Sequence, residues 1–464
     1  MKKIISVILT FAVALMMLCT FTVSAETPDF QVENGTLLKY SGSDSKVTLP
    51  DSVYAVADYA FYGNTKLTSV DLNGVILIGN KAFSGCSNLD EIKNADKISS
   101  VGAFAFENTP YLNSKSGNVI LGSVLLMGAS GETYTVPKGV KSIAPYCFLS
   151  DSSLKKVTIP DEVCEIGEGA FYGCSNLSSV SVAESVSNIG AFAFEGTKFL
   201  SDFKSDFVIL GNSILVNYKG TASEVTIPED VLQIGAGAFY KNNILEKVNF
   251  PEGVSYIGVR AFSGCSSLEE FEFPETLKVI SKEAFADCTS LKSITIPHTV
   301  TAVGESAFLG CTALLEAEYF SDADIPAGLF AGCTSLASVY IACETESVGD
   351  FAFLDCSYLR EISLPDTVRL VSTSCSEGAD KLTVYANKGS RGYMAFESMN
   401  VKVSQIGDAD SNGTLNIRDA TFIQKASADM VTMTLSNRLR GDADFNGVVN
   451  VRDATKVQKV LAGI

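Results

Sequence analysis

The sequence predicts an α/β repeat solenoid, built from parallel strands and helical turns, followed by a small all-α domain. Three observations support this prediction: a phenylalanine-containing motif that recurs at a nearly fixed period, two almost identical acidic segments near the C-terminus, and an apolar segment at the N-terminus. A repeat period of about 20 to 50 residues is typical of folds in which each unit packs only against its neighbours. We therefore divide the chain into segments 1–25, 27–404 and 405–464.

The first 25 residues have the organisation of a secretory signal peptide. Two lysines follow the first residue, an uncharged apolar run covers residues 4–23, and the small residues Ser24 and Ala25 precede Glu26. This pattern favours a cleaved signal peptide over a membrane span. Because no later run of about 18 apolar residues follows, we expect a secreted, extracellular chain without a transmembrane segment.

The composition argues against two classes of function. The formal net charge of −18 would repel phosphate backbones, so we expect no nucleic-acid partner. The chain has no Trp and one His, His298, which occupies a turn position that other repeats fill with Asp or Glu. A glycosidase needs two carboxylates opposed across a cleft, and adjacent pairs such as Glu269–Glu270 have no such partner in the pattern. We expect that the protein is not an enzyme.

One phenylalanine marks each repeat. Successive positions are separated by 22 or 23 residues within each run, which predicts about 12–13 coils in segment 27–404. The positions are Phe61, Phe83, Phe106, Phe148, Phe171, Phe194, Phe239, Phe262, Phe285, Phe308, Phe330 and Phe353.

Residues 154–174 illustrate one coil. Residues 154–159 alternate between apolar and polar side chains, as a strand with one buried face does. Pro160 ends this strand because it has no N–H to donate to a neighbouring strand. Residues 163–167 turn the chain back beneath the core, and a tight helical turn then places Phe171 inside.

A cysteine follows the repeat phenylalanine by three residues in seven coils. A small, weakly polar residue at the same place in successive coils predicts a buried ladder of reduced thiols that pack as small hydrophobic groups. Disulfides would need a pairwise geometry that a uniform ladder does not favour. These residues are Cys86, Cys174, Cys265, Cys288, Cys311, Cys333 and Cys356.

Two insertions divide the coils into three blocks. Segments 122–137 and 211–228 fill the longer steps and resemble segment 34–50. Each predicts a two-strand hairpin that starts a block, and we interpret the insertions as structural in preference to ligand-binding. The solenoid ends at a predicted cap, residues 381–403, in which Gly389–Ser390 precede a short helix. A cap of this kind covers the open end of the stack.

Outward positions of successive strands form two columns, which we call the strand face. Glutamates alternate with hydroxyl-bearing residues along it, which suggests an acidic groove for a cationic or sugar-bearing ligand; a solvated sheet surface is the alternative. The paired positions are Lys247/Asn249, Glu270/Glu272, Ser293/Thr295, Glu316/Glu318, Ser338/Tyr340 and Glu361/Ser363.

The repeat pattern LxxIxIPxxVxxIGxxAFxxC resembles the BspA-like class of leucine-rich repeats, which occur in bacterial surface and secreted proteins. The resemblance covers about residues 34–404. It implies a curved solenoid that binds proteins or surfaces, and it implies no catalytic chemistry.

The two acidic segments, DADSNGTLNIRD (408–419) and DADFNGVVNVRD (442–453), have the spacing of calcium-binding loops. Such a loop takes oxygen ligands from positions 1, 3, 5, 7, 9 and 12 and needs Gly at position 6. Gly413 and Gly447 occupy position 6. The predicted ligands of two structural Ca²⁺ ions are Asp408, Asp410, Asn412, Thr414 (carbonyl), Asn416 and Asp419, and Asp442, Asp444, Asn446, Val448 (carbonyl), Asn450 and Asp453.

Both loops differ from an EF-hand, because position 12 is Asp and no amphipathic helix precedes the first loop. The order loop–helix, linker, loop–helix, with a period of 34 residues, resembles a dockerin over residues 405–464. Dockerins are calcium-dependent domains that attach proteins to cohesin modules on cellulosome scaffolds. The resemblance implies cohesin contacts at Ile417, Arg418, Gln424, Lys425, Val451, Arg452, Gln458 and Lys459.

Loop positions 10 and 11 carry Ile–Arg and Val–Arg, where better-known dockerins have a Ser/Thr pair, so the cohesin class stays open. The near identity of the two halves would allow docking in two orientations. Residues 405–464 contain seven acidic and seven basic residues, and we expect this domain to be disordered or loose until it binds calcium.

Together these features predict a secreted, non-catalytic binding protein associated with the cell surface through a scaffold. Its solenoid would hold a protein or glycan target, and its dockerin would bind a cohesin. One alternative is a structural or regulatory subunit, for example an inhibitory one. Another is an unrecognised carbohydrate-active enzyme of polysaccharide degradation.

Overall fold

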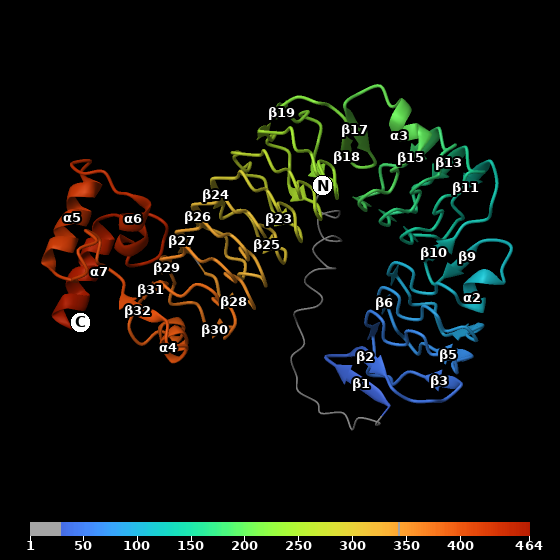
Figure 1. The fold of residues 1–464 in the computed structure, drawn as a ribbon, viewed down its shortest axis with the longest axis horizontal. Coiled ribbons are helices and arrows are strands. Elements are labelled where there is room, and N and C mark those ends of the chain that lie inside the picture. The colour runs from blue at the N-terminus through green and yellow to red at the C-terminus, as the bar shows by residue number, and fades with distance from the viewer. Residues whose placement is uncertain (1–28, 342–343) are drawn as a thin grey trace. The chain divides into compact units, whose positions relative to one another are not determined.

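The computed structural model describes residues 29–341 and 344–464 (Figure 1), and the predicted signal peptide lies outside them. The chain forms two compact units, Met1–Lys115 and Ser116–Ile464. Among the helices of the described ranges, none has the length and apolar character needed to cross a membrane.

The first unit contains two sheets with strand orders β1-β2-β4-β6-β8 and β3-β5-β7. β1 and β2 are antiparallel, and the remaining pairs are parallel. The elements are β1 (Phe30–Glu33), β2 (Thr36–Tyr40), β3 (Lys46–Thr48), β4 (Ala55–Val56), β5 (Ser69–Asp71), β6 (Leu77–Ile78), β7 (Glu91–Lys93), β8 (Ser100–Val101) and the short helix α2 (Pro110–Asn113).

The second unit begins with another block of coils. Its sheets have the orders β16-β14-β12-β10-β9 and β11-β13-β15. The elements are β9 (Val119–Leu121), β10 (Val124–Met127), β11 (Thr133–Thr135), β12 (Ser142–Ile143), β13 (Lys156–Ile159), β14 (Glu165–Ile166), β15 (Ser179–Val182), β16 (Asn188–Ile189) and α3 (Lys198–Asp202).

The remaining coils form four sheets, with orders β17-β18-β20-β22-β23-β25, β19-β21, β24-β26-β27-β29-β31-β32 and β28-β30. Their strands are β17 (Phe207–Leu210), β18 (Ile214–Tyr218), β19 (Glu224–Thr226), β20 (Gln233–Ile234), β21 (Lys247–Asn249), β22 (Tyr256–Ile257), β23 (Val279–Ile280), β24 (Ser293–Ile296), β25 (Ala302–Val303), β26 (Glu316–Tyr319), β27 (Ser338–Ile341), β28 (Ser347–Val348), β29 (Glu361–Ser363), β30 (Leu370–Val371), β31 (Thr383–Ala386) and β32 (Lys402–Gln405).

The C-terminal part of the second unit is helical. Helix α4 begins after its N-cap Ser390, at the position where the sequence predicts a helix, and packs against β30, β31 and β32. Three further helices follow the last strand. The elements are α4 (Arg391–Ser398), α5 (Ile417–Ser427), α6 (Leu435–Gly441) and α7 (Val451–Ala462).

The coil at residues 154–174 differs from the predicted one in two respects. The predicted strand is present as β13, but β14 adds a second, two-residue strand where the sequence suggested only a return turn. The predicted helical turn at Phe171 is a run of tight turns. Within the coil the Tyr172 and Cys174 N–H groups donate to the carbonyls three residues earlier at 2.8 and 3.2 Å, whereas the Phe171 N–H donates to the Ala193 carbonyl of the next coil at 2.8 Å. Hydrogen bonds within the coil thus alternate with hydrogen bonds that join neighbouring coils.

The repeat phenylalanines form the central stack. All twelve are at most 3% exposed. Within each block, consecutive rings are stacked with centroids 4.8–6.1 Å apart, close to the spacing of neighbouring strands. The prediction that this residue points inward in every coil is confirmed.

The hairpin prediction was wrong in its pairing. The two strands of segment 34–50, β2 and β3, join different sheets, and the antiparallel partner of β2 is the preceding strand β1. The other blocks repeat this arrangement with β9–β10 and β17–β18. The reason is that β3 pairs in parallel with the other long strands. β2 pairs instead with β4 and so belongs to the column of two-residue strands.

The cysteine ladder is reduced, as predicted. Each of the seven ladder thiols is fully buried and donates to the carbonyl of the phenylalanine one coil earlier, with Sγ···O distances of 2.9–3.3 Å. Burial raises the pKa of Cys86 and Cys174 to about 11 and that of Cys265 to about 12. Since the thiolate is the reactive form, the ladder is chemically protected.

We expect a thiol reagent such as DTNB to label Cys164 in the native chain and to leave the other nine of the ten described cysteines unlabelled. Cys164 is the exposed member of these ten. Mass spectrometry of the labelled peptides, with and without denaturant, provides the measurement. The Cys164→Ser variant serves as the control, and rapid native labelling of Cys288 would contradict the buried ladder.

Candidate metal centres and docking surfaces

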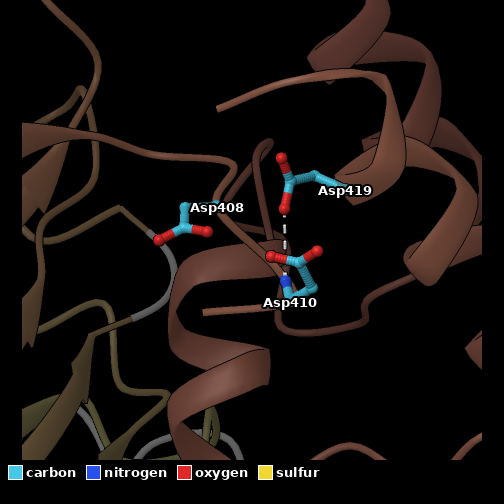
Figure 2. Close-up of side chains that lie close together, drawn as sticks. All are labelled: Asp408, Asp410 and Asp419. Atoms are coloured by element: carbon cyan, nitrogen blue, oxygen red, sulfur yellow. Dashed lines mark hydrogen bonds between the residues drawn. The ribbon is translucent and has the colours of Figure 1, made fainter. Parts of the chain in front are cut away.

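The first acidic loop folds around Asp408. The Asp408 carboxylate accepts hydrogen bonds from the backbone N–H groups of Asn412 at 3.1 Å and Gly413 at 2.9 Å. Asp419, from helix α5, reaches back and accepts from the Asp410 N–H at 3.2 Å (Figure 2). One oxygen from each of the three aspartates lies within 4.8 Å of the others. The loop thus gathers the predicted carboxylate ligands of positions 1, 3 and 12.

The second loop repeats this geometry. Asp442 accepts from the N–H groups of Asn446 at 3.3 Å and Gly447 at 2.9 Å. Asp453 accepts from the Asp444 N–H at 3.1 Å, and oxygens of these three aspartates also lie within 4.8 Å of one another. The same loop positions therefore donate and accept these hydrogen bonds in both loops.

The predicted ligands at position 9 also have a structural role. Asn416 caps helix α5 by accepting from the Arg418 N–H at 2.9 Å, while its amide donates to the Thr414 carbonyl at 2.7 Å. Asn450 caps α7 in the same way. Because the side-chain oxygen is used by the cap, these residues fit a ligand role through water, which is common at position 9.

The other side-chain ligand predicted in each loop lies at position 5, where Asn412 and Asn446 accept from the backbone N–H groups of Thr414 and Val448, each at 2.9 Å.

The carboxylate clusters are buried, and this determines their electrostatics. Asp419, Asp442 and Asp453 are fully buried and Asp408 is 5% exposed. Burial is the main cause that raises the pKa of Asp419, Asp442 and Asp453, and the neighbouring Asp442 and Asp444 add to the effect at Asp453, whose pKa rises to about 7. A divalent cation would offset both the desolvation and the mutual repulsion. The donor set of carboxylates, amides and carbonyls is the one that calcium prefers.

Helices α5 and α7 pack on each other behind the loops. Each begins with a capping box, Asn416 with Asp419 and Asn450 with Asp453, so the position-12 aspartate serves both the helix and the cluster. Helix α6 was not predicted. Its N-terminal Thr434 and Asn437 form a capping box that the sequence displays as TxxN. The small core comprises Ala409, Ala420, Ile423, Ala443, Ala454 and Val457.

All eight predicted cohesin contacts are exposed on the surface of this helical part. Ile417 is 59% and Val451 is 57% exposed, although both are large apolar residues at the start of a helix. Exposed apolar side chains flanked by arginines are common in docking surfaces. The full set is Ile417, Arg418, Gln424, Lys425, Val451, Arg452, Gln458 and Lys459.

The strand face is present, but the prediction that it is solvent-exposed was wrong at two positions. Ser293, Glu316, Ser338 and Glu361 align in register, as do Thr295, Glu318 and Tyr340. Tyr340 and Ser363, however, are fully buried. Tyr340 is buried because the C-terminal helical part covers it, and the hydroxyl of Ser363 bonds to the backbone of Ile341.

Two neighbouring cavities open where the third block of coils begins. One, of about 590 Å³, is lined by polar residues including Glu195, Lys198 and Asn217. The other, of about 410 Å³, shares Asn217 and is lined by aromatic residues including Tyr172 and Tyr240. Aromatic faces beside amide and carboxylate groups suit hydroxyl-rich or peptide ligands. No local pattern in the sequence indicates these cavities, because their lining comes from three different coils and an insertion.

The repeat region matches the family described as BspA type leucine rich repeat region (6 copies), over residues 38–120, 119–207, 209–325 and 323–400. The chain belongs to the BspA type leucine-rich repeat family. The family matches end before the two acidic loops, whose assignment rests on their own sequence and geometry. No curated protein matches this leucine-rich repeat chain.

Several solved leucine-rich repeat structures are similar to this chain. A leucine-rich cell surface protein from Faecalibacterium prausnitzii is 24% identical over 69% of this chain and 95% of that one, with a TM-score of 0.31. The pneumococcal vaccine antigen PcpA is 18% identical over 82% and 98%, with a TM-score of 0.36. A leucine-rich repeat protein from Bacteroides ovatus is 24% identical over 83% and 99%, with a TM-score of 0.34.

Proposed function

We propose that this leucine-rich repeat protein is a secreted, non-catalytic binding protein that docks, through a calcium-dependent dockerin at residues 405–464, onto a cohesin of an extracellular scaffold. The observation that carries the proposal is the pair of buried carboxylate clusters with identical loop geometry. Each cluster is followed by a capped helix that presents an exposed apolar residue and an arginine. This combination suits a domain that is shaped by calcium and binds another protein.

A non-catalytic role for the solenoid is supported by its family and by its chemistry. Its ladder cysteines have raised pKa values, so they are poor nucleophiles. The cavities at the third block offer aromatic, amide and carboxylate groups, which suit recognition of a protein or glycan on an extracellular surface.

Isothermal titration of the purified chain lacking residues 1–25 tests the calcium part. We expect two Ca²⁺ ions per chain, one in the Asp410→Ala variant, and none in the Asp410→Ala/Asp444→Ala variant. Capture of the calcium-loaded chain on a panel of immobilised cohesins, with chelator as the control, tests the docking part. Wild-type chain that binds no calcium, or binds calcium and none of the cohesins, would reject the dockerin assignment.

The target of the solenoid is tested with an array of plant polysaccharides, mucins and secreted proteins. The Tyr172→Ala/Tyr240→Ala variant is the matched probe of the aromatic cavity, and Tyr358→Ala, whose ring is 59% exposed elsewhere, is the control. We expect the double variant to lose at least one target that the control retains. Sugar release by the wild-type chain would instead support an enzyme.

A further inference from the structure

Helix α6 lies against the strand face of the solenoid and carries the charges that complement it (Figure 1). Arg438 pairs with Glu318 at 2.9 Å. Arg440 pairs with Glu361, which also accepts a hydrogen bond from the Ser436 hydroxyl at 2.6 Å. Two of the five glutamates of the predicted acidic groove, Glu318 and Glu361, are therefore matched by residues of helix α6.

An apolar core joins the two parts beneath these ion pairs. Leu439 of α6 and Phe445 of the second loop are buried together with Tyr340 and Tyr385 of the solenoid. The Phe320 ring meets Tyr340 edge-on, with centroids 5.7 Å apart, and lies against Gly447 of the loop. A shared apolar core with matched charges is typical of a specific interface, whereas an accidental surface contact has neither.

The same contacts reach the first carboxylate of each acidic loop. The Tyr340 hydroxyl donates a hydrogen bond to Asp442 Oδ2. On the other loop, Arg440 Nη1 lies 3.3 Å from Asp408 Oδ2 while its Nη2 pairs with Glu361. The carboxylate at position 1 of each loop is thus held by a hydrogen-bond donor. Tyr340, the donor for Asp442, belongs to the solenoid, and Arg440, the donor for Asp408, is anchored to the solenoid through Glu361.

The arrangement fixes the orientation of the Asp442 carboxylate. Its Oδ2 accepts from the Tyr340 hydroxyl and the Gly447 N–H, its Oδ1 accepts from the Asn446 N–H at 3.3 Å, and the carboxylate lies in the cluster with Asp444 and Asp453. Partners that fix the orientation of a metal ligand commonly change metal affinity by about 10- to 100-fold. Tyr340 has the position of such a partner, although it lies 102 residues away in sequence.

We propose that Tyr340 is a positioning residue for the second calcium loop, and that calcium binding and docking of residues 405–464 on the strand face strengthen each other. This inference rests on the calcium binding in the proposed function. Coupling between two binding events is reciprocal, so whatever docking adds to calcium affinity, calcium adds to docking. The docked state still exposes all eight predicted cohesin contacts.

The two loops are unequal in this respect. The second loop contacts the solenoid directly through Asp442 and Phe445, while the first loop is linked to it through Arg440. Two loops that look equivalent in sequence are therefore expected to bind calcium with different affinities in the full chain. The pseudo-twofold symmetry of the sequence is broken by the solenoid.

The Tyr340→Phe variant of the full chain tests the inference, because it removes the hydroxyl and keeps the ring. By isothermal titration we expect one of the two calcium affinities to fall by about tenfold and the other to change little. Hydrogen exchange of the wild-type chain should show that a chelator lowers protection in α6 and in β27 together. Tyr319→Phe is the matched control, since its buried hydroxyl bonds to the Ala323 and Asp324 carbonyls and not to an acidic loop.

Unchanged calcium affinities in Tyr340→Phe, or unchanged exchange in β27 after chelation, would overturn the coupling while leaving two-ion binding intact. An equal loss of affinity in Tyr319→Phe would show a general effect of the sheet and would also overturn it. A wild-type chain that binds no calcium would overturn both this inference and the proposed function.

Discussion

Replacing Phe285 with Ala is expected to lower the free energy of unfolding by about 3–5 kcal/mol, as for other fully buried phenylalanines. The ring is 0% exposed and stacks on Phe262 at 5.1 Å and on Phe308 at 5.4 Å. It also contacts Phe271, with centroids 4.8 Å apart. Because each coil is stabilised only by its neighbours, the cavity left by the missing ring weakens the packing against both neighbouring coils at once.

The measurement is the denaturant midpoint of the full chain, combined with hydrogen exchange to locate the weakened coils, since a long solenoid need not unfold in two states. Leu315→Ala is the control, because this side chain is 52% exposed and should change stability by less than about 0.5 kcal/mol. A loss below about 1 kcal/mol in Phe285→Ala would mean that the stack relaxes around the cavity.

Chelation of calcium at pH 7.5 is expected to loosen residues 405–464, and lowering the pH to 5 is expected to restore part of their stability. The pKa of Asp453 is raised in the folded, calcium-free protein to about 7, above the value of about 3.9 for an unfolded chain. A group with a raised folded pKa contributes stability at low pH that is lost as the pH rises through the folded value. The loss therefore falls between about pH 4 and pH 7.

Circular dichroism and hydrogen exchange, with and without chelator across this pH range, provide the measurement. At saturation about 100-fold above the dissociation constant, each ion adds about 2.7 kcal/mol, so the calcium-dependent gain should be greatest at neutral pH. Asp453→Asn should lose one bound ion. Asp429→Asn, at an exposed position, is the control, and a calcium-free domain that grows more stable from pH 5 to 7.5 would contradict the argument.

Local patterns in the sequence predicted much of the fold. The repeat phenylalanines and ladder cysteines are correctly placed because each phenylalanine stacks on the phenylalanine one coil away, and each cysteine bonds to the phenylalanine carbonyl of the preceding coil. The two-residue strands such as β14 escaped prediction because their pairing depends on neighbouring coils, not on an alternation within the strand. The pairing of β2 with β1 was missed for the same reason, since β1 lies outside the repeat pattern.

The candidate metal centres were predictable because ligand spacing within a twelve-residue loop is local. The contact between Tyr340 and Asp442 was not, because nothing in either segment identifies a partner 102 residues distant. Burial of Tyr340 follows from the position of α6, and the sequence gives only a capping box for that helix. Calcium binding and cohesin recognition stay predictions.

The antiparallel strand at the start of each block has a consequence for how such proteins change length. In all three blocks, the pair β1–β2, β9–β10 or β17–β18 terminates the column of two-residue strands. A single coil inserted or lost within a block must match the Phe, Cys and strand registers on both sides. A whole block contains the antiparallel strand that ends its own sheet, so gene duplication or deletion of a block would preserve the folding of the rest. The block, and not the single coil, is thus the unit by which this repeat can be lengthened or shortened in evolution or design.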